Sequence, residues 1–231
     1  MKKFYKSADA AEQGGGFTVQ LDGRAIKTPA KTAFIVPGRA LADAIAQEWQ
    51  DQDEELDIAS MSLTGLSYAA IDRVRIHRED IAQDIAAYAA NDLLCYRADN
   101  PQELVARQSD AWDPILDWAR DTLDIDLVTV AGIISAEQSP EAPAKARAQV
   151  DACDDFMLAG LDRLTHITGS LILALAVRHG RIDATEAYEL GHLEERWQAE
   201  LWGTDAEAEQ RHETRIRELV SAERFVRLLA D

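Results

Sequence analysis

Apolar and polar residues alternate along the first ~36 residues, a pattern typical of strands with one buried face. Asp22-Gly23 separates two of these segments, and this pair favours a two-residue hairpin turn because both turn positions need a positive φ. Gly14–Gly16 precede the first segment and predict a flexible turn, since neither a Lys-Ser/Thr pair nor a helix start follows them. The predicted strands of this antiparallel sheet are Phe17–Leu21, Arg24–Thr28 and Ala33–Val36.

From residue 39 onward, apolar residues recur every three or four positions, which is typical of amphipathic helices. The segment Asn100–Glu103 predicts a helix start, with Asn as the N-cap and Pro in the first turn. Pro114 lies inside one pattern, so either that helix kinks or Asp113 caps a new one. The apolar stripes run over Leu41–Trp49, Leu63–Val74, Ile81–Tyr88, Leu104–Ala119, Val150–Leu164, Leu171–Val177, Ala187–Leu201 and His212–Leu229.

These patterns predict an α+β protein with a small N-terminal antiparallel β domain and a larger, mostly α-helical domain. We place the β domain, with one helix, at residues 1–60 and the helical domain at residues 61–231. The β-branched segment Leu127–Ile134 is expected to be extended rather than helical. Leu171–Val177 is almost wholly apolar and is expected to be the most buried helix.

The composition excludes several classes of function. The chain has 231 residues with 24 Lys and Arg against 42 Asp and Glu, a formal net charge of −18. Nucleic acids and anionic membranes both need a basic surface, so neither is an expected partner. No apolar run approaches the roughly 20 residues that span a bilayer, so membrane insertion is not expected. The first residues resemble neither a secretory signal nor an organelle presequence, which favours a cytosolic protein.

Catalytic signatures are absent from the sequence. It contains no P-loop, no dinucleotide-binding glycine motif, no nucleophile elbow and no HExxH motif. His192 and Glu195 are three residues apart, but one such pair falls short of a metal site. Cys95 and Cys153 lie among apolar neighbours and are expected to be buried thiols. No metal or cofactor is therefore expected.

Glu194 and the tryptophans are the best candidates for a binding surface. Glu194 falls on the apolar stripe between Leu190 and Trp197, where a carboxylate must be paired, protonated or reserved for a partner. Tryptophans flanked by acids could be core residues or the hot spot of an acidic-rimmed interface. The five tryptophans are Trp49, Trp112, Trp118, Trp197 and Trp202.

A collinear set of motifs resembles one known family. The motifs are Phe4-Tyr5-Lys6, Leu21-Asp22-Gly23-Arg24, Lys27-Thr28-Pro29, Ala46-Gln47-Glu48-Trp49, Met61-Ser62-Leu63-Thr64, Asn91 to Ala98, Trp112-Asp113-Pro114, Gly169-Ser170-Leu171, Leu193 to Gln198 and Trp202-Gly203. Together they are similar to the assembly chaperone of the F-type ATP synthase that binds the free α subunit of the catalytic head, the ATP synthase assembly factor 2 family. One departure is Ser62, where the family has Pro after Met.

The resemblance implies a function without catalysis. Members of that family hold the isolated α subunit soluble until the β subunit replaces the chaperone, and they need no nucleotide or other cofactor. The positions it implies to be sensitive are Trp49, next to Glu48, and an acid that is either Glu194 or Glu195. With Trp112 and Trp197, these residues form the predicted partner-binding set.

The sequence leaves two other functions open. An acidic interaction module could serve a different client, and a hydrolase could use acid pairs or the His192–Glu195 pair. The resemblance favours the chaperone. Related family members are imported into the mitochondrial matrix, and because the first residues here do not resemble a presequence, we expect a bacterial, cytoplasmic member.

Overall fold

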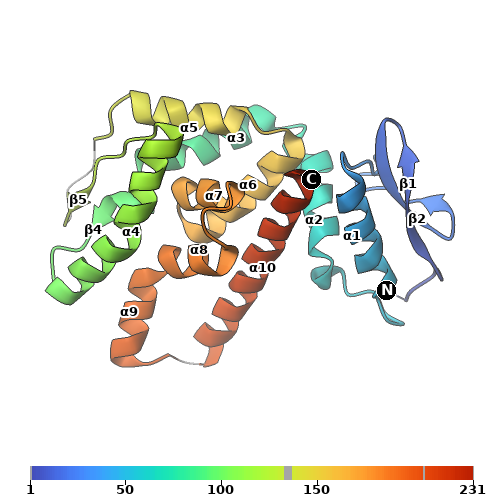
Figure 1. The fold of residues 1–231 in the computed structure, drawn as a ribbon. Helices are drawn as coiled ribbons and strands as arrows, with labels where there is room; N and C mark the ends of the chain where they lie inside the picture. The colour runs from blue at the N-terminus through green and yellow to red at the C-terminus, as the bar shows by residue number, and fades with distance from the viewer. Residues whose placement is uncertain (1, 133–136, 205, 231) are drawn as a thin grey trace. The chain divides into compact units, whose positions relative to one another are not determined.

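The computed structural model describes residues 2–132, 137–204 and 206–230 (Figure 1). A three-stranded antiparallel sheet near the N-terminus precedes a mostly helical chain, which confirms the predicted α+β class. The chain divides into two compact units. The first contains Met1–Arg78, Asp154–Gly160 and Arg224–Asp231, and the second contains Glu79–Cys153 and Leu161–Glu223. The domain boundary at residue 60 stays a prediction.

The sheet of the first unit begins earlier than the sequence pattern indicates. Strand β1 (Ala8–Gln13) pairs antiparallel with β2 (Gly16–Leu21), and β2 pairs with β3 (Arg24–Ala25). The glycine loop is thus the β1–β2 turn, in which Gly14 and Gly15 have positive φ. The predicted position of this loop ahead of the sheet was wrong, because the alanines and acids of β1 have little intrinsic strand preference and pairing with β2 overrides it.

The other two predicted strands are shorter or irregular. The predicted strand Arg24–Thr28 ends at Ala25 as β3, and the predicted strand Ala33–Val36 makes only isolated bridges. Val36 bridges Phe17, and Ala33 bridges Lys27. Pro29 has no N–H to donate to a ladder, which is consistent with the interruption of regular pairing after β3.

Helix α1 (Arg39–Gln50) packs against β1 and β2, as Figure 1 shows in blue. Its predicted stripe is confirmed, since Leu41, Ile45 and Trp49 are all buried. A 3₁₀ turn (Ile58–Ser60), helix α2 (Ser62–Ala69) and a π-helical turn (Ala70–Val74) follow. Phe156 stacks on Phe225 in the same unit, with ring centroids 6.5 Å apart.

The chain from residue 78 onward is mainly helical. Short strands β4 (Tyr96–Arg97) and β5 (Val130–Ala131) pair in parallel, so part of the predicted extended segment is a strand; its last residues, 133 and 134, lie outside the described residues. 3₁₀ turns occupy Tyr88–Ala90 and Leu93–Cys95. The α-helices are α3 (Arg78–Ala87), α4 (Gln102–Leu123), α5 (Glu141–Asp151), α6 (Asp155–Thr168), α7 (Leu171–Arg178), α8 (Ala184–Gly191), α9 (Leu193–Trp202) and α10 (Ala206–Ala230).

Helix α7 lies at the centre of the second unit, as its composition predicts. Every residue from 171 to 177 is buried, and both α4 and α8 pack against it. The Ser170 side chain caps the helix by accepting a hydrogen bond from the Leu173 N–H at 3.0 Å. Helix α4 runs unbroken through Pro114, which resolves the alternative of a new helix at Asp113. Pro114 is exposed, so water can solvate the carbonyl that its missing N–H leaves unpaired.

Two predicted helices are each divided in two. The stripe over Val150–Leu164 is split because α5 ends at Asp151 and Asp154 caps α6, accepting the Met157 N–H at 2.7 Å. The stripe over Ala187–Leu201 is split at His192. A Cβ on Gly191 would lie 2.5 Å from the Thr168 carbonyl oxygen, so glycine allows the close approach at the end of α8.

Among the residues that the structure describes, no helix combines the length and the apolar character needed to cross a membrane.

Candidate partner-binding surface

Glu48 connects helices α1 and α2 in the first unit. Its carboxylate accepts the backbone N–H groups of Leu63 and Thr64 at 2.7 and 2.8 Å, and the Thr64 hydroxyl at 2.8 Å. These are donors at the start of α2, which have no partner inside their own helix. Glu48, which was predicted to bind a partner, therefore lies on α1 and caps the start of α2.

Trp49 is 7% exposed and lies in the core of the same unit. Its backbone carbonyl accepts the Tyr5 hydroxyl at 2.6 Å, and the two rings meet edge to face with centroids 5.7 Å apart. Its buried indole Nε1 has no hydrogen-bond partner among the described residues. Trp49 also lines a cavity of about 590 Å³ within this unit.

Trp112 is buried in the second unit, on the inner face of α4. Its Nε1 donates to the carbonyl oxygen of Leu190 at 2.9 Å, which ties α4 to the end of α8. The guanidinium of Arg97 lies 5.1 Å from the centre of the indole. Trp112 therefore supports the position of the chain that leads into α9.

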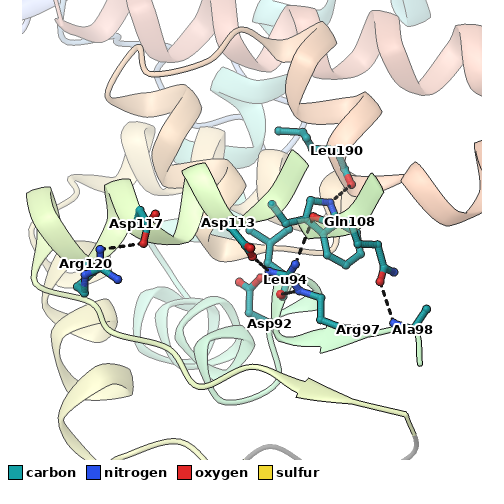
Figure 2. A network of polar contacts seen from close by, with 10 residues as sticks. Asp92, Leu94, Arg97, Ala98, Gln108, Asp113, Asp117, Arg120 and Leu190 are labelled. Carbon is teal, nitrogen blue, oxygen red and sulfur yellow. Dashed lines mark hydrogen bonds and ion pairs between the residues drawn. The ribbon is translucent and has the colours of Figure 1, made fainter. Parts of the chain in front are cut away.

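Gln108 links α4 to the loop after β4 and to α9. Its Oε1 accepts the Ala98 N–H at 2.8 Å, and its Nε2 donates to Glu194 Oε1 at 2.6 Å. Figure 2 shows the neighbouring contacts of Arg97, which donates to the carbonyls of Leu94 and Gln108 and pairs with Asp113 at 2.8 Å. This polar network joins the loop after β4, helix α4 and helix α9.

Helix α9 presents its acids to solvent. Leu193 is its one buried residue among those described, while Glu194 and Glu195 are exposed. The expectation that Glu194 lies on a core stripe was wrong, because the break at His192 changes the helical phase after α8. Glu194 is nevertheless paired, through its hydrogen bond to Gln108.

Trp197 is half-buried between α9 and α4. The Arg107 guanidinium lies 5.8 Å from the centre of its indole ring. Arg107 also donates two hydrogen bonds to Glu200, at 2.6 and 2.7 Å. The hydrogen bonds from Arg107 hold the pKa of the Glu200 carboxyl below its usual value. The guanidinium that is paired with Glu200 thus covers one face of the Trp197 ring.

The end of α9 carries two exposed apolar residues that lie outside the predicted partner-binding set, although Trp202 was among the candidate tryptophans. Leu201 is 56% exposed and Trp202 is 78% exposed. Gly203 follows directly and ends the helix, so no further turn of α9 covers these side chains. In the sequence, Gly203 could have indicated that the helix ends here and leaves these two side chains uncovered. We call Glu194, Glu195, Trp197, Leu201 and Trp202 the α9 surface.

The groups proposed for hydrolysis show structural roles. His192 is buried and stacks on Tyr188 at 4.0 Å, and burial lowers the pKa of its imidazole. The Tyr188 hydroxyl is hydrogen-bonded to His212 Nδ1.

Both cysteines are buried, as predicted, and burial raises the pKa of the Cys95 thiol to about 12. No cluster of metal-binding side chains occurs among the described residues.

Sequence and structural similarity define the chain as an assembly chaperone. A family model described as ATP12 chaperone protein matches residues 2–120, half of the chain. The chain therefore belongs to this family of ATP synthase assembly chaperones, which confirms the resemblance of its motifs.

Curated and solved relatives agree with this assignment. The chain is 26% identical over 222 residues to the mitochondrial protein atp12 of Schizosaccharomyces pombe, covering 90% of this chain and 76% of the relative. It is 41% identical to crystalline Atp12 from Paracoccus denitrificans, with a TM-score of 0.95 over 99% of this chain and 98% of that one. The Atu1473 protein from Agrobacterium tumefaciens gives 40% identity and a TM-score of 0.95 over 99% of this chain and 86% of that one.

Proposed function

We propose that this chaperone binds the free α subunit of the F-type ATP synthase, prevents its aggregation and releases it to the β subunit. Family membership supports the role in ATP synthase assembly and implies a function without catalysis. An α subunit without its neighbours exposes large apolar interfaces, which are an aggregation hazard. A chaperone that covers them must later be displaced, so its affinity must be finite. We place this exchange in the bacterial cytoplasm.

The observation that carries the proposal is the composition of the α9 surface. It combines the exposed Leu201 and Trp202 with the exposed carboxylates of Glu194 and Glu195. Tryptophan is enriched in binding hot spots, and the rim around an interface core is polar. The apolar side chains would bury the client's interface, and the acids would select a basic edge around it.

The two glutamates differ in their surroundings, which suggests different roles. Glu194 is hydrogen-bonded to the buried Gln108, so we assign it to holding α9 against α4. Glu195 lines a cavity of about 450 Å³ together with Trp202, and we assign it to direct contact with the client. Trp197 would support the surface from its packed position beside Arg107.

The test is co-expression of the chaperone with a lone α subunit, followed by measurement of soluble α and of the complex recovered by pull-down. We expect the wild-type chaperone to raise the soluble fraction. Glu195→Lys and Trp202→Ser should each weaken capture by roughly tenfold or more, as hot-spot residues do. Asp84→Lys is the matched control, since Asp84 is an exposed acid in the middle of α3.

Each part of the proposal has its own contradicting result. Equal insolubility of α with and without the chaperone would reject α as the client. Recovery of another protein in place of α would favour an acidic module with a different partner. Capture that survives both α9 variants would reject the α9 surface while leaving the client in place.

A further inference from the structure

The first unit contains a second candidate site, remote in sequence from the α9 surface. A cavity of about 590 Å³ lies between the N-terminal segment, the β2–β3 hairpin and α1. Its lining includes the aromatic rings of Phe4, Tyr5, Trp49 and Tyr68. This volume is in the range of cavities that hold small ligands or one large side chain with its neighbours.

One residue of the lining, Trp49, also carries a buried donor without a partner among the described residues. The indole Nε1 of Trp49 is inaccessible to solvent and makes no hydrogen bond to any described residue. Buried N–H groups are almost always paired, because an unpaired donor has lost its water without replacement. The indole N–H is itself closed off from the cavity, so Trp49 contributes its ring to the lining, and its indole signal can report on what binds there.

The rim of the cavity is basic although the protein is strongly acidic. Arg24 and Lys27 are exposed on the hairpin and both line the cavity. Neither makes an ion pair with any residue in the described part of the chain. The one acid in the lining, Asp22, already accepts the backbone N–H groups of Lys6 and Ser7, both at 3.0 Å. The cations are therefore available to an acidic ligand.

The geometry points to a docking site for a client segment that carries an aromatic or large aliphatic side chain next to a carboxylate. The apolar side chain would fill the cavity between the rings of Phe4 and Tyr68. The ring of Trp49 would pack against that side chain, and Arg24 and Lys27 would pair with the carboxylate. This inference rests on the proposed function only in taking the segment to come from the client.

The experiment follows the indole N–H signals of the ¹⁵N-tryptophan-labelled full chain by NMR. The probe is the peptide acetyl-Gly-Phe-Asp-Asp-Gly-amide, and acetyl-Gly-Phe-Lys-Lys-Gly-amide is its control. The Trp49 signal is assigned with Trp49→Phe or, if that variant does not fold, through its nuclear Overhauser contacts to Tyr5. We expect the acidic peptide to shift the Trp49 signal, with a much smaller shift from the basic peptide.

Charge variants test the rim. The double variant Arg24→Glu/Lys27→Glu should weaken binding of the acidic peptide by roughly tenfold or more, in line with removal of two charge pairs. Lys2→Glu/Lys31→Glu makes the same change in net charge at exposed lysines outside the cavity lining and should leave binding unchanged. Equal weakening by both double variants would overturn the inference, because only the net charge would then matter.

Two further results would also overturn it. One is an unmoved Trp49 signal at millimolar acidic peptide, and the other is an equal shift with both peptides. Because the assay uses no α subunit, a chaperone that fails to capture α but binds the acidic peptide would reject the proposed client and keep this site. The reverse outcome would keep the client and reject the site.

Discussion

At the scale of single residues, buried polar groups connect segments that are distant in sequence. Asp92 is fully buried and accepts the Leu94 N–H at 3.1 Å and the Ile172 N–H at 3.2 Å. It thereby caps one 3₁₀ turn and holds the first turn of the central helix α7. Burial raises the pKa of its carboxyl from 3.8 to about 6, and the hydrogen bonds that lower the pKa offset this only in part.

This raised pKa makes stability depend on pH. The pKa is higher in the folded than in the unfolded chain, so the stabilising contribution of protonated Asp92 is fully present below about pH 4 and is lost as the pH rises through about 6. Between pH 5 and 7, we expect the free energy of unfolding of the wild type to fall by about 1 kcal/mol relative to Asp92→Asn. Urea unfolding of both proteins at a series of pH values measures this change in the free energy of unfolding.

The comparison isolates the titration of one carboxyl. Asp92→Asn presents an amide to backbone donors and will itself be less stable, but this loss does not vary with pH. Parallel stability curves for the two proteins would show that Asp92 does not titrate in this range.

At the scale of elements, local patterns predicted most helices, and the missed features arise from contacts between segments. The stripes of α1, α4 and α7 are long enough to identify each helix and its buried face. The break at His192 depends on Gly191 meeting the Thr168 carbonyl, which no local pattern contains. Strand β1 was missed for the same reason, since only pairing with β2 makes its alanine-rich sequence a strand.

The candidate site was predictable to a similar degree. Motifs selected Glu194, Glu195 and Trp197, which lie together on α9, but also Glu48, Trp49 and Trp112, whose side chains are engaged in packing or capping. Whether a tryptophan is exposed depends on what covers its helix. Trp112 and Trp202 both have acids within three positions in the sequence, yet one is 1% and the other 78% exposed.

The capping role of Glu48 predicts a loss of stability on substitution. Glu48→Ala removes three hydrogen bonds at the start of α2 and leaves the buried N–H groups there without an acceptor. Loss of a helix cap costs about 1–2 kcal/mol, and we expect a decrease of this size in the free energy of unfolding by urea. Binding of the acidic peptide by the folded variant should persist, since Glu48 does not line the cavity.

Asp43→Ala is the control for that substitution. Asp43 lies on the same helix and its exposed ion pair with Arg39 should contribute under about 0.5 kcal/mol. Equal stability of Glu48→Ala and Asp43→Ala would show that the start of α2 does not depend on the Glu48 cap.

At the scale of the whole molecule, the net charge of −18 repels itself in the folded state. Most of the ion pairs are exposed, and each such pair adds little to stability. The self-repulsion should therefore dominate the response of the protein to salt.

Salt is accordingly expected to stabilise the chaperone. Raising NaCl from about 10 to 150 mM shortens the Debye length from roughly 30 to 8 Å and screens the repulsion. The expected rise in Tm is roughly 2–4 °C, measured by circular dichroism at one protein concentration. A fall in Tm over this range would mean that the ion pairs outweigh the repulsion.

Helix α9 has a consequence for how quickly a client can leave. Because Leu193 is its one buried residue in the described structure, α9 is anchored mainly by polar contacts to α4, and polar contacts at a surface exchange readily with water. We expect such a helix to open more readily than α7, in which every residue from 171 to 177 is buried. A client bound at the α9 surface as proposed would then be released by local opening of one short helix, without unfolding of the chaperone.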